Sequence, residues 1–475
     1  MHMKDLQKFS ATQRWVLALA AAGSFMAVLD AMVVTTALET LRHDLSASVT
    51  ALEWTVNAYS LSFAALLMTG AALGDRFGRR RMYIGGLLVF AASSAACAVA
   101  PNTAWLIAGR EAQGLGAALV MPIALALLGT AFAPAQRPRA LGMFSGITGL
   151  AVLSGPVMGG ALVHGLTWQW IFWVNLPVAI VVAWFVRSKV PEGKGASAPL
   201  DIAGGVLMTL SLVPMVWGLV QGNQAGWTSP EVIGALGLGI VVGFGFIASQ
   251  RLRARDAMVP PRLFRSPVLG AGLIVALLLS ASLFGTLFFM AQFFQVTRGA
   301  SPLSAGASML PWTATLFIVA PIAGSMVRRV GERALVVTGL TLQAGGMVWL
   351  SMLARGETAY VAWVLPLMIA GAGISMAMPG AQSAVLGAVE PQDIGKAAGL
   401  FNTLRQLGGV LGVAVTVAVF VRVCGYASAH EFGNGFAAAL LTSALLSLAG
   451  AAMALRLRGR TAPAAPASNV EGAKA

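Results

Sequence analysis

Charged residues are scarce in this chain of 475 residues, because Asp, Glu, Lys and Arg together make up only 10% of it. A water-soluble domain usually carries about 25% charged residues, so the sequence lacks the polar surface that a soluble protein of this length needs. The deficit extends over the whole chain, which excludes a soluble body with a single membrane anchor. The composition, 57% hydrophobic, therefore indicates a polytopic membrane protein.

Cysteine and histidine are scarce as well. The two cysteines, Cys97 and Cys424, lie far apart with no metal-ligand spacing near either, so we expect no disulfide framework and no metal site. The four histidines are scattered, and the sequence has no nucleophile elbow and no phosphate-binding loop. These absences favour a protein that is not an enzyme, needs no cofactor and does not use ATP directly.

Long apolar runs are abundant, and none has the two-residue alternation of a membrane barrel. We expect spans at 15–37, 53–73, 82–100, 104–132, 140–163, 169–186, 201–220, 231–250, 268–293, 305–326, 334–353, 360–386, 398–421 and 435–456. These fourteen runs predict an all-α polytopic protein with both termini on one side. No small-residue cleavage site follows the basic N-terminus, so the first run is expected to be a retained span.

Lysine and arginine predict the orientation of the spans, because cytoplasmic loops carry an excess of both. With the N-terminus inside, the inner segments hold 25 of the 31 basic residues. Arg110 and Arg405 fall inside spans, and the outer segments hold only Arg42, Arg298, Arg355 and Arg422. The net charge of +14 is therefore interpreted as a topology signal with no nucleic-acid partner, and both termini are predicted to be cytoplasmic.

A basic turn with a central glycine occurs twice, at 74–80 and at 327–333, which hints at duplicated halves. Four sets of residues carry a more specific signal: Gly70–Arg81; Arg110-Glu-Ala-Gln-Gly114; Gly155-Pro-Val-Met-Gly-Gly160; and Leu29-Asp30 together with Trp170–Pro177. The first resembles the loop signature of the major facilitator superfamily. The others, in the same order and in the appropriate spans, resemble motifs of its fourteen-span drug:proton antiporter branch.

The resemblance implies a fold of two six-helix bundles with two extra central spans. The expected domains are 1–14 (cytoplasmic segment), 15–186 (first bundle), 187–267 (linker with the two extra spans), 268–458 (second bundle) and 459–475 (disordered cytoplasmic tail). The implied function is proton-coupled antiport that exports amphiphilic or cationic drug-like compounds across the bacterial cytoplasmic membrane by alternating access.

Two alternatives remain open, a dedicated exporter of one endogenous metabolite and a proton symporter of the same fold. The expected partners are a small-molecule substrate, protons and the lipid bilayer, and a periplasmic adaptor protein is left open.

Asp30 is the first candidate for proton coupling and for binding substrate. A carboxylate inside a membrane span costs several kcal/mol, so it should face a cavity or a partner. Arg110 is a permanent cation, and the resemblance implicates it in proton coupling, paired either with Asp30 or with another span. Glu111 follows directly and is either a second protonatable site or a packing position.

The resemblance also assigns gating to two segments. Asp75 and the arginines of the 74–81 loop would form an inner latch near a helix N-terminus of the other half. Proline bends a helix and glycines allow close approach of a partner helix, so the 155–160 segment would seal the resting pathway. The gating candidates are Gly74, Asp75, Arg76, Gly78, Arg79, Arg80, Gly155, Pro156, Gly159 and Gly160.

Further polar side chains inside spans are candidates for lining a central, mostly uncharged pocket. They are Asn57, Tyr59, Gln113, Gln292, Gln295, Asn402 and Arg405. For each residue alone, packing is the simpler explanation. Arg405 would either attract anionic substrate groups or anchor Asn402 and Gln406.

Overall fold

A computed structural model describes residues 9–133, 136–193, 201–253, 257–356, 358–390, 393–423 and 428–457. Within these ranges, fourteen helical segments are long and apolar enough to cross a membrane, which confirms the all-α prediction. The predicted disordered tail and Cys424 lie outside the described residues.

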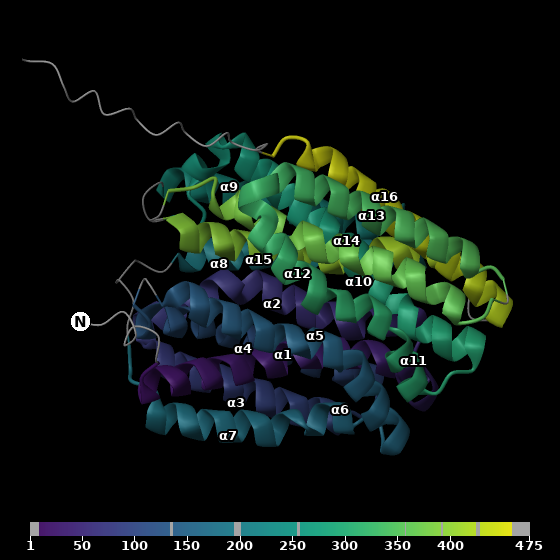
Figure 1. The fold of residues 1–475 in the computed structure, drawn as a ribbon, viewed down its shortest axis with the longest axis horizontal. Coiled ribbons are helices and arrows are strands. Elements are labelled where there is room, and N and C mark those ends of the chain that lie inside the picture. The colour runs from purple at the N-terminus through teal and green to yellow at the C-terminus, as the bar shows by residue number, and fades with distance from the viewer. Residues whose placement is uncertain are drawn as a thin grey trace, which may run out of the picture.

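The first half contains six of these spans (purple to blue in Figure 1). The sixth span consists of two consecutive helices that meet at Val174. The helices are α1 (Ala11–Asp44), α2 (Val49–Phe77), α3 (Arg79–Ala98), α4 (Thr103–Ala131), α5 (Arg137–Gly165), α6 (Trp170–Trp173) and α7 (Asn175–Lys189).

The second half also contains six spans, and it lies above the first in Figure 1 (green to yellow). Its helices are α10 (Pro267–Arg298), α11 (Pro302–Ser308), α12 (Leu310–Val330), α13 (Glu332–Leu353), α14 (Val361–Leu386), α15 (Ile394–Val423) and α16 (Ala429–Ala454). Between the halves in sequence come α8 (Ile202–Ala225), α9 (Pro230–Arg253) and the short 3-10 helix η2 (Pro261–Arg265).

The two basic turns of the sequence have the same backbone geometry. Gly78 (φ 105°) ends α2 and begins α3, and Gly331 (φ 90°) ends α12 and begins α13. Residues with a side chain rarely adopt a positive φ, so glycine allows each pair of spans to reverse direction without a longer loop. The repeated motif is therefore a repeated structural corner.

α2 begins at Val49, one turn before the start predicted at residue 53. Ser48 caps the helix, because its Oγ accepts a hydrogen bond from the backbone N–H of Ala51 at 3.2 Å. The extra turn places Glu53 inside the span.

The extra spans α8 and α9 pack side by side, and α8 lies against helices of both halves. Val216 and Val220 of α8 form an apolar cluster with Leu61 of α2 and with Val410 and Ala414 of α15. By contrast, only 11% of the apolar window of α9 is buried, against 72% for α1. We conclude that α8 covers the seam between α2 and α15, and that α9 faces lipid.

Asp201 fastens the inner end of this hairpin. It caps α8 through the N–H of Gly204 at 2.8 Å and accepts a hydrogen bond from Gln250 Nε2 of α9 at 2.6 Å. Burial alone would raise the pKa of Asp201. The hydrogen bonds from Gln250, Gly204 and Met258, with Arg253 nearby, outweigh burial and hold this pKa below its usual value.

The two halves are packed together at their outer ends. A Cβ on Gly160 of α5 would lie 2.8 Å from the Cα of Leu303 in α11. A Cβ on Gly306 of α11 would lie 2.7 Å from the carbonyl carbon of Pro156. Such approaches are possible only because both positions are glycine.

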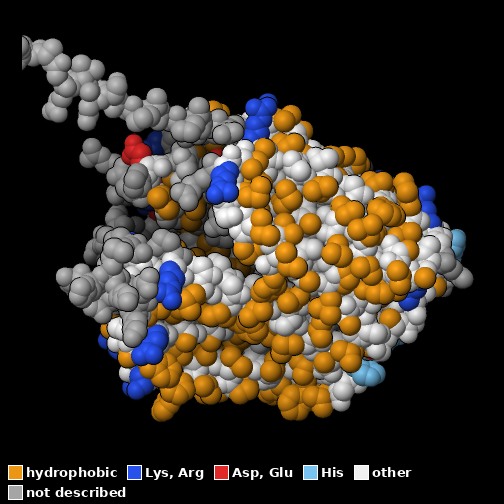
Figure 2. Space-filling view, viewed as in Figure 1, with side chains coloured by type: hydrophobic (Ala, Val, Ile, Leu, Met, Phe, Trp, Pro, Cys, Tyr) orange, Lys and Arg blue, Asp and Glu red, His pale blue; other side chains and the backbone are white. Residues whose placement is uncertain are grey.

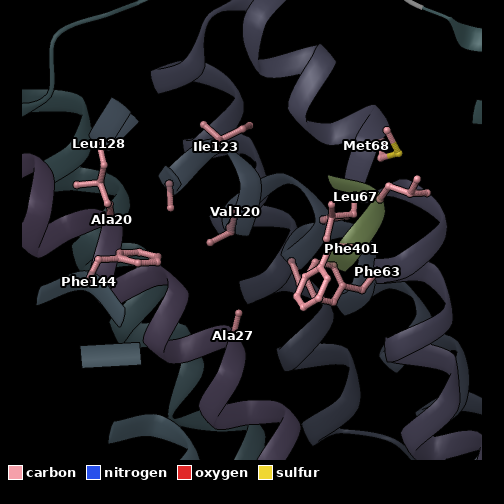
Figure 3. Packing of buried hydrophobic residues seen from close by; sticks show 14 of the residues in the cluster. Ala20, Ala27, Phe63, Leu67, Met68, Val120, Ile123, Leu128, Phe144 and Phe401 are labelled. Atoms are coloured by element: carbon pink, nitrogen blue, oxygen red, sulfur yellow. The ribbon is translucent and has the colours of Figure 1, made fainter. Parts of the chain in front are cut away.

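Toward the inner ends, α5 and α12 separate. A Cβ on Gly142, Gly146 or Gly324 would meet nothing within 4 Å. Figure 2 shows the molecule hollowed between its halves near the end that carries the N-terminus. On the other flank α2 and α15 stay in contact, and Figure 3 shows Phe401 of α15 beside Phe63 and Leu67 of α2. The conformation is closed on the outside and open on the inside along the α5–α12 flank.

Candidate functional site

Asp30 and Arg110 form an ion pair in the interior of the first half. Arg110 Nη1 of α4 donates to Asp30 Oδ2 of α1, and the two residues are 1% and 2% exposed. A lone charge buried this deeply costs several kcal/mol. The pair has no net charge, so each residue lowers the free-energy cost of burying the other.

Amide and hydroxyl groups satisfy the other side of the carboxylate. Asp30 Oδ1 accepts from Asn175 Nδ2 of α7 at 2.8 Å and from Gln113 Nε2 of α4 at 3.2 Å. Gln113 also donates to Ser94 Oγ of α3 at 2.6 Å and accepts from Arg110 Nη1 at 2.7 Å. The network therefore joins α1, α3, α4 and α7.

α2 completes the surroundings of the guanidinium. Arg110 Nε donates to the carbonyl of Thr55 at 3.2 Å, and its Cζ lies 4.5 Å from the ring centroid of Tyr59. The hydroxyl of Tyr59 donates to the carbonyl of Ala27 at 3.1 Å. Cation–π contact of this kind stabilises a desolvated guanidinium.

The arrangement has a chemical consequence for any proton that reaches Asp30. Every hydrogen-bond partner of this carboxylate in the described residues is a donor from the first half. Protonation would remove the negative charge that compensates Arg110, so the pair would have to rearrange. The groups that such a rearrangement would affect all belong to the first half.

Glu111 is separated from this network. It is exposed on α4, because one helical position turns its side chain by about 100° from that of Arg110. Leu115, one turn later, is exposed on the same stripe. The structure does not bring Glu111 to Asp30.

The remaining pocket candidates fall into separate groups. Gln113 and Tyr59 belong to the network around Asp30, as described above. Gln295 Nε2 of α10 donates to the carbonyl of Thr36 in α1 at 3.1 Å, so Gln295 helps to join the outer ends of the halves. Gln292 Nε2 donates to the carbonyl of Phe288, one turn earlier in its own helix, at 2.5 Å.

Arg405 of α15 is a half-buried cation of the second half. Among the described residues no carboxylate pairs with it, and its Nε is buried without a hydrogen-bond acceptor. Asn402 Nδ2 donates to the carbonyl of Ala398 at 3.0 Å, so Arg405 does not anchor it. Since arginine stays charged, this site retains a positive charge.

The inner latch residues form ion pairs with the first half and with the segment that directly follows α7 in this conformation. Arg79 Nη2 lies 2.6 Å from Asp75 Oδ1, and Arg80 Nε lies 3.7 Å from Glu192 Oε2. Arg76 is exposed, with its Cζ 5.6 Å from the Phe77 ring centroid. Gly74 packs on α4, where a Cβ would lie 2.8 Å from Ile123 Cγ1.

The 155–160 segment packs on both halves. Gly155 and Gly159 lie against α1, where a Cβ on Gly159 would be 2.8 Å from the carbonyl oxygen of Val33. Gly160 and Pro156 face α11 of the second half, as described above. The segment is therefore part of the outer closure.

A family model described as Major Facilitator Superfamily matches residues 20–413. The chain belongs to this superfamily. It is related to the fourteen-span group of the superfamily, whose members among its relatives are drug and antibiotic resistance and export proteins. It is a transporter and not an enzyme, as the sequence predicts.

Three relatives illustrate this placement. The chain is 33% identical over 404 residues to a tetracenomycin C resistance and export protein of Streptomyces glaucescens, covering 84% of this chain and 75% of the relative. It is 33% identical over 447 residues to a methylenomycin A resistance protein of Bacillus subtilis, covering 93% of both. It is 34% identical over 417 residues to a cephamycin export protein of Amycolatopsis lactamdurans, covering 86% of this chain and 85% of the relative.

Solved structures share the fold at low identity. A bacterial homologue of the human lysosomal transporter Spinster, in an inward-facing and occupied conformation, matches with a TM-score of 0.69 and 15% identity, over 94% of this chain and 97% of that one. A peptide transporter in complex with alafosfalin matches with a TM-score of 0.68 and 15% identity, over 93% and 96%. The transporter is therefore a multi-pass membrane protein of the major facilitator fold.

Sequence reasoning missed three polar residues of the interior. Ser94 and Asn175 hold the Asp30 network together. Asn175 lies in the Trp170–Pro177 motif, to which no site role was given, and a short polar side chain in an apolar run was the only signal for Ser94. Glu53 is 0% exposed, although the predicted start of the second span placed it at the boundary. In the described residues, no group of three His, Cys, Asp or Glu side chains could hold a metal ion.

Proposed function

We propose that this transporter is a proton-coupled antiporter that exports amphiphilic compounds, including cationic ones, across the bacterial cytoplasmic membrane. The observation that carries the proposal is the buried Asp30–Arg110 pair in a molecule that is closed at its outer ends. Ionisable residues buried inside membrane spans usually mark ion pathways or proton relays. The resistance exporters among its relatives support the substrate class.

In this proposal protons bind to Asp30 of the Asp30–Arg110 pair. A proton on Asp30 cancels the charge that holds Arg110 Nη1, so α1 and α4 repack. α1 also carries the contacts with α5 and with Gln295 of α10, so repacking reaches the outer closure. Each proton that moves inward supplies about 2.3 kcal/mol per 100 mV of membrane potential.

The test uses energised inverted vesicles and a fluorescent dye that reports the pH gradient. A panel of quaternary ammonium compounds and neutral amphiphiles is added from outside, to wild type and to Asp30→Asn. We expect compounds to discharge the gradient with wild type only. A discharge that survives in Asp30→Asn would remove Asp30 from the coupling step.

The same experiment separates the alternatives. A dedicated metabolite exporter would respond to one compound and ignore the rest of the panel. A symporter would not discharge the gradient when substrate is added from outside, because substrate and proton would have to leave the vesicle together. Glu111→Gln serves as the control, since Glu111 lies outside the network.

A further inference from the structure

Glu53 is the buried acid of the described structure that lacks a positively charged partner. It lies on α2 in the outer part of the span and is 0% exposed. Its only hydrogen bond among the described residues comes from Asn57 Nδ2 to Oε1, at 3.5 Å. Its other oxygen, Oε2, has no donor, and Asn57 Oδ1 has none either.

The missing partner is therefore a donor or a positive charge. Oε2 and Oδ1 both accept hydrogen bonds, and two orphaned acceptors in a buried site are costly. A proton on the carboxyl removes the buried charge and turns one of its oxygens into a donor. A cation placed beside the ionised carboxylate would compensate the same charge. Proton and cation are thus alternative occupants of one site.

Five helices pack against α2, and four of them carry charged or titratable groups. They are Arg14, Asp30, Glu39, Arg42, His43 and Asp44 on α1; Arg79, Arg80, Arg81, Tyr83 and Cys97 on α3; Arg110 and Glu111 on α4; and Lys396, Arg405 and Arg422 on α15. α8 carries no titratable residue.

Four of these groups are arginines inside a span or at its outer end. Arg422 is exposed in the last turn of α15 and forms no ion pair with Glu53 in the described residues. Arg110 is bound to Asp30, and Arg42 is bound to Glu39 at 2.7 Å. Arg405 lies closer than Glu53 to the inner end of the α2–α15 contact. Gly399, six residues before Arg405, is level with Met68 of α2, because a Cβ built on Gly399 would lie 3.4 Å from Met68 Cγ. Arg405, six residues further along the antiparallel α15, is therefore level with about residue 62 of α2, and about nine residues, or about 14 Å of helix rise, separate it from Glu53.

Glu53 also lies on the side of α2 that faces the second half. Positions 53, 57, 64 and 68 share one helical face, because each differs from the others by close to whole turns. Met68 on this face contacts Gly399 of α15. Tyr59 and Ser62, by contrast, turn toward α1 and α4. Glu53 therefore lies on the face of α2 that packs toward the second half, whereas Asp30 is enclosed within the first half.

We propose that Glu53, together with Asn57, is a second proton-binding site, which releases its proton when an organic cation enters the space between the halves. The step balances, because the carboxyl loses one proton to solvent and gains the single positive charge of the cation. Asp30 then controls packing inside the first half, and Glu53 selects for cationic substrate. The proposal rests on the proposed function and adds its substrate class.

The test is performed on the purified full-length transporter, with dodecyltrimethylammonium as the probe. This quaternary ion cannot carry a proton itself. Binding is measured across neutral and mildly acidic pH, and proton release is followed in weakly buffered solution. For wild type we expect about one proton released per cation bound, with affinity falling up to about tenfold for each unit that the pH is lowered.

Glu53→Gln should abolish proton release and make the affinity nearly independent of pH. Glu53→Asp should retain both proton release and the pH dependence of the affinity. Glu111→Gln removes a carboxylate from an exposed face of α4, so this variant should behave as wild type. A residue with only a structural role would change the thermal midpoint and leave the pH dependence intact. Proton release that persists in Glu53→Gln would overturn the proposal.

The outcome is separate from that of the vesicle experiment. If wild type fails to bind the probe at every pH, the cation site is overturned, and discharge of the gradient by neutral compounds would leave the proposed antiport standing. If proton release depends on Glu53 but no compound discharges the gradient, the site stands and the proposed antiport fails.

Discussion

The two halves of the transporter share their helical plan but differ at the centre of each bundle. In the first half, an ion pair lies among α1, α3, α4 and α7. In the second, the corresponding helices α10, α13 and α16 meet through neutral groups. Ser282 Oγ lies 2.7 Å from Ser447 Oγ and 3.4 Å from Gln343 Nε2.

This difference indicates how duplicated halves can divide the work. A buried ion pair is weak evidence for stability, because desolvation cancels most of its attraction. The neutral hydroxyl cluster holds the same helices without that cost. The first half therefore buries a charged pair at its centre, on which the proposed coupling depends, and the second half holds its helices together with neutral groups.

Arg110→Met should have the largest effect. The substitution leaves Asp30 buried and uncompensated, which typically costs about 3–5 kcal/mol, so we expect a large fall in the thermal midpoint and no transport. The double variant Asp30→Leu/Arg110→Met should recover much of the midpoint but none of the transport. An unchanged midpoint in Arg110→Met would show that the ion pair does not stabilise the first half.

Gly160→Val should weaken the contact between the halves. The new side chain would press on Leu303 of α11, and overpacking of this kind costs about 1–3 kcal/mol. The cost falls on the outside-closed state, so spin labels on the outer ends of α5 and α11 should move apart. Gly146→Val on the same helix is the matched control, because its Cβ would meet nothing within 4 Å.

Arg405→Gln should separate charge from stability in the second half. Because no carboxylate compensates Arg405 in the described residues, we expect a thermal midpoint equal to or above that of wild type. Binding of an anionic amphiphile should weaken about tenfold, or about 1.4 kcal/mol. Arg422→Gln, at the exposed outer end of α15, is the control. A marked loss of stability would mean that Arg405 has a structural partner.

Ser282→Ala should have the smallest effect of the four. It removes neutral hydrogen bonds from the second half, and we expect a cost of about 1 kcal/mol with transport retained. Ser325→Ala, whose hydroxyl bonds only to the carbonyl of Ile322 at 2.7 Å, should be neutral. If Ser282→Ala stopped transport, the second half would have to take part in coupling.

The span pattern was predictable because hydropathy depends only on composition along the chain. Asp30 and Arg110 were predictable as candidates for the same reason, since charge inside an apolar run is rare. Their pairing was one of two open alternatives, because sequence does not determine which spans are neighbours. The roles of Ser94 and of Asn175, which was noted only as part of the Trp170–Pro177 motif, could not be predicted, because each acts through residues at least 19 positions away.

Small errors in position along the chain account for the remaining differences. The predicted start of the second span came one turn late, which concealed Glu53 at a boundary. Ser48, a helix-capping residue just before the apolar run, was the available signal. Glu111 was grouped with Arg110 by sequence, but neighbours on a helix point in different directions.

The outer closure between α5 and α11 is built from Gly160, Pro302, Gly306 and Pro156. Burying a long side chain costs up to about 2 kcal/mol of rotamer entropy, whereas glycine and proline lose none. The outer face of the molecule can therefore shut and reopen at this contact without ordering or releasing any side chain. We therefore expect these residues to contribute little to the entropy difference between the outside-closed and outside-open states. Raising the temperature alone should do little to open the contact between α5 and α11.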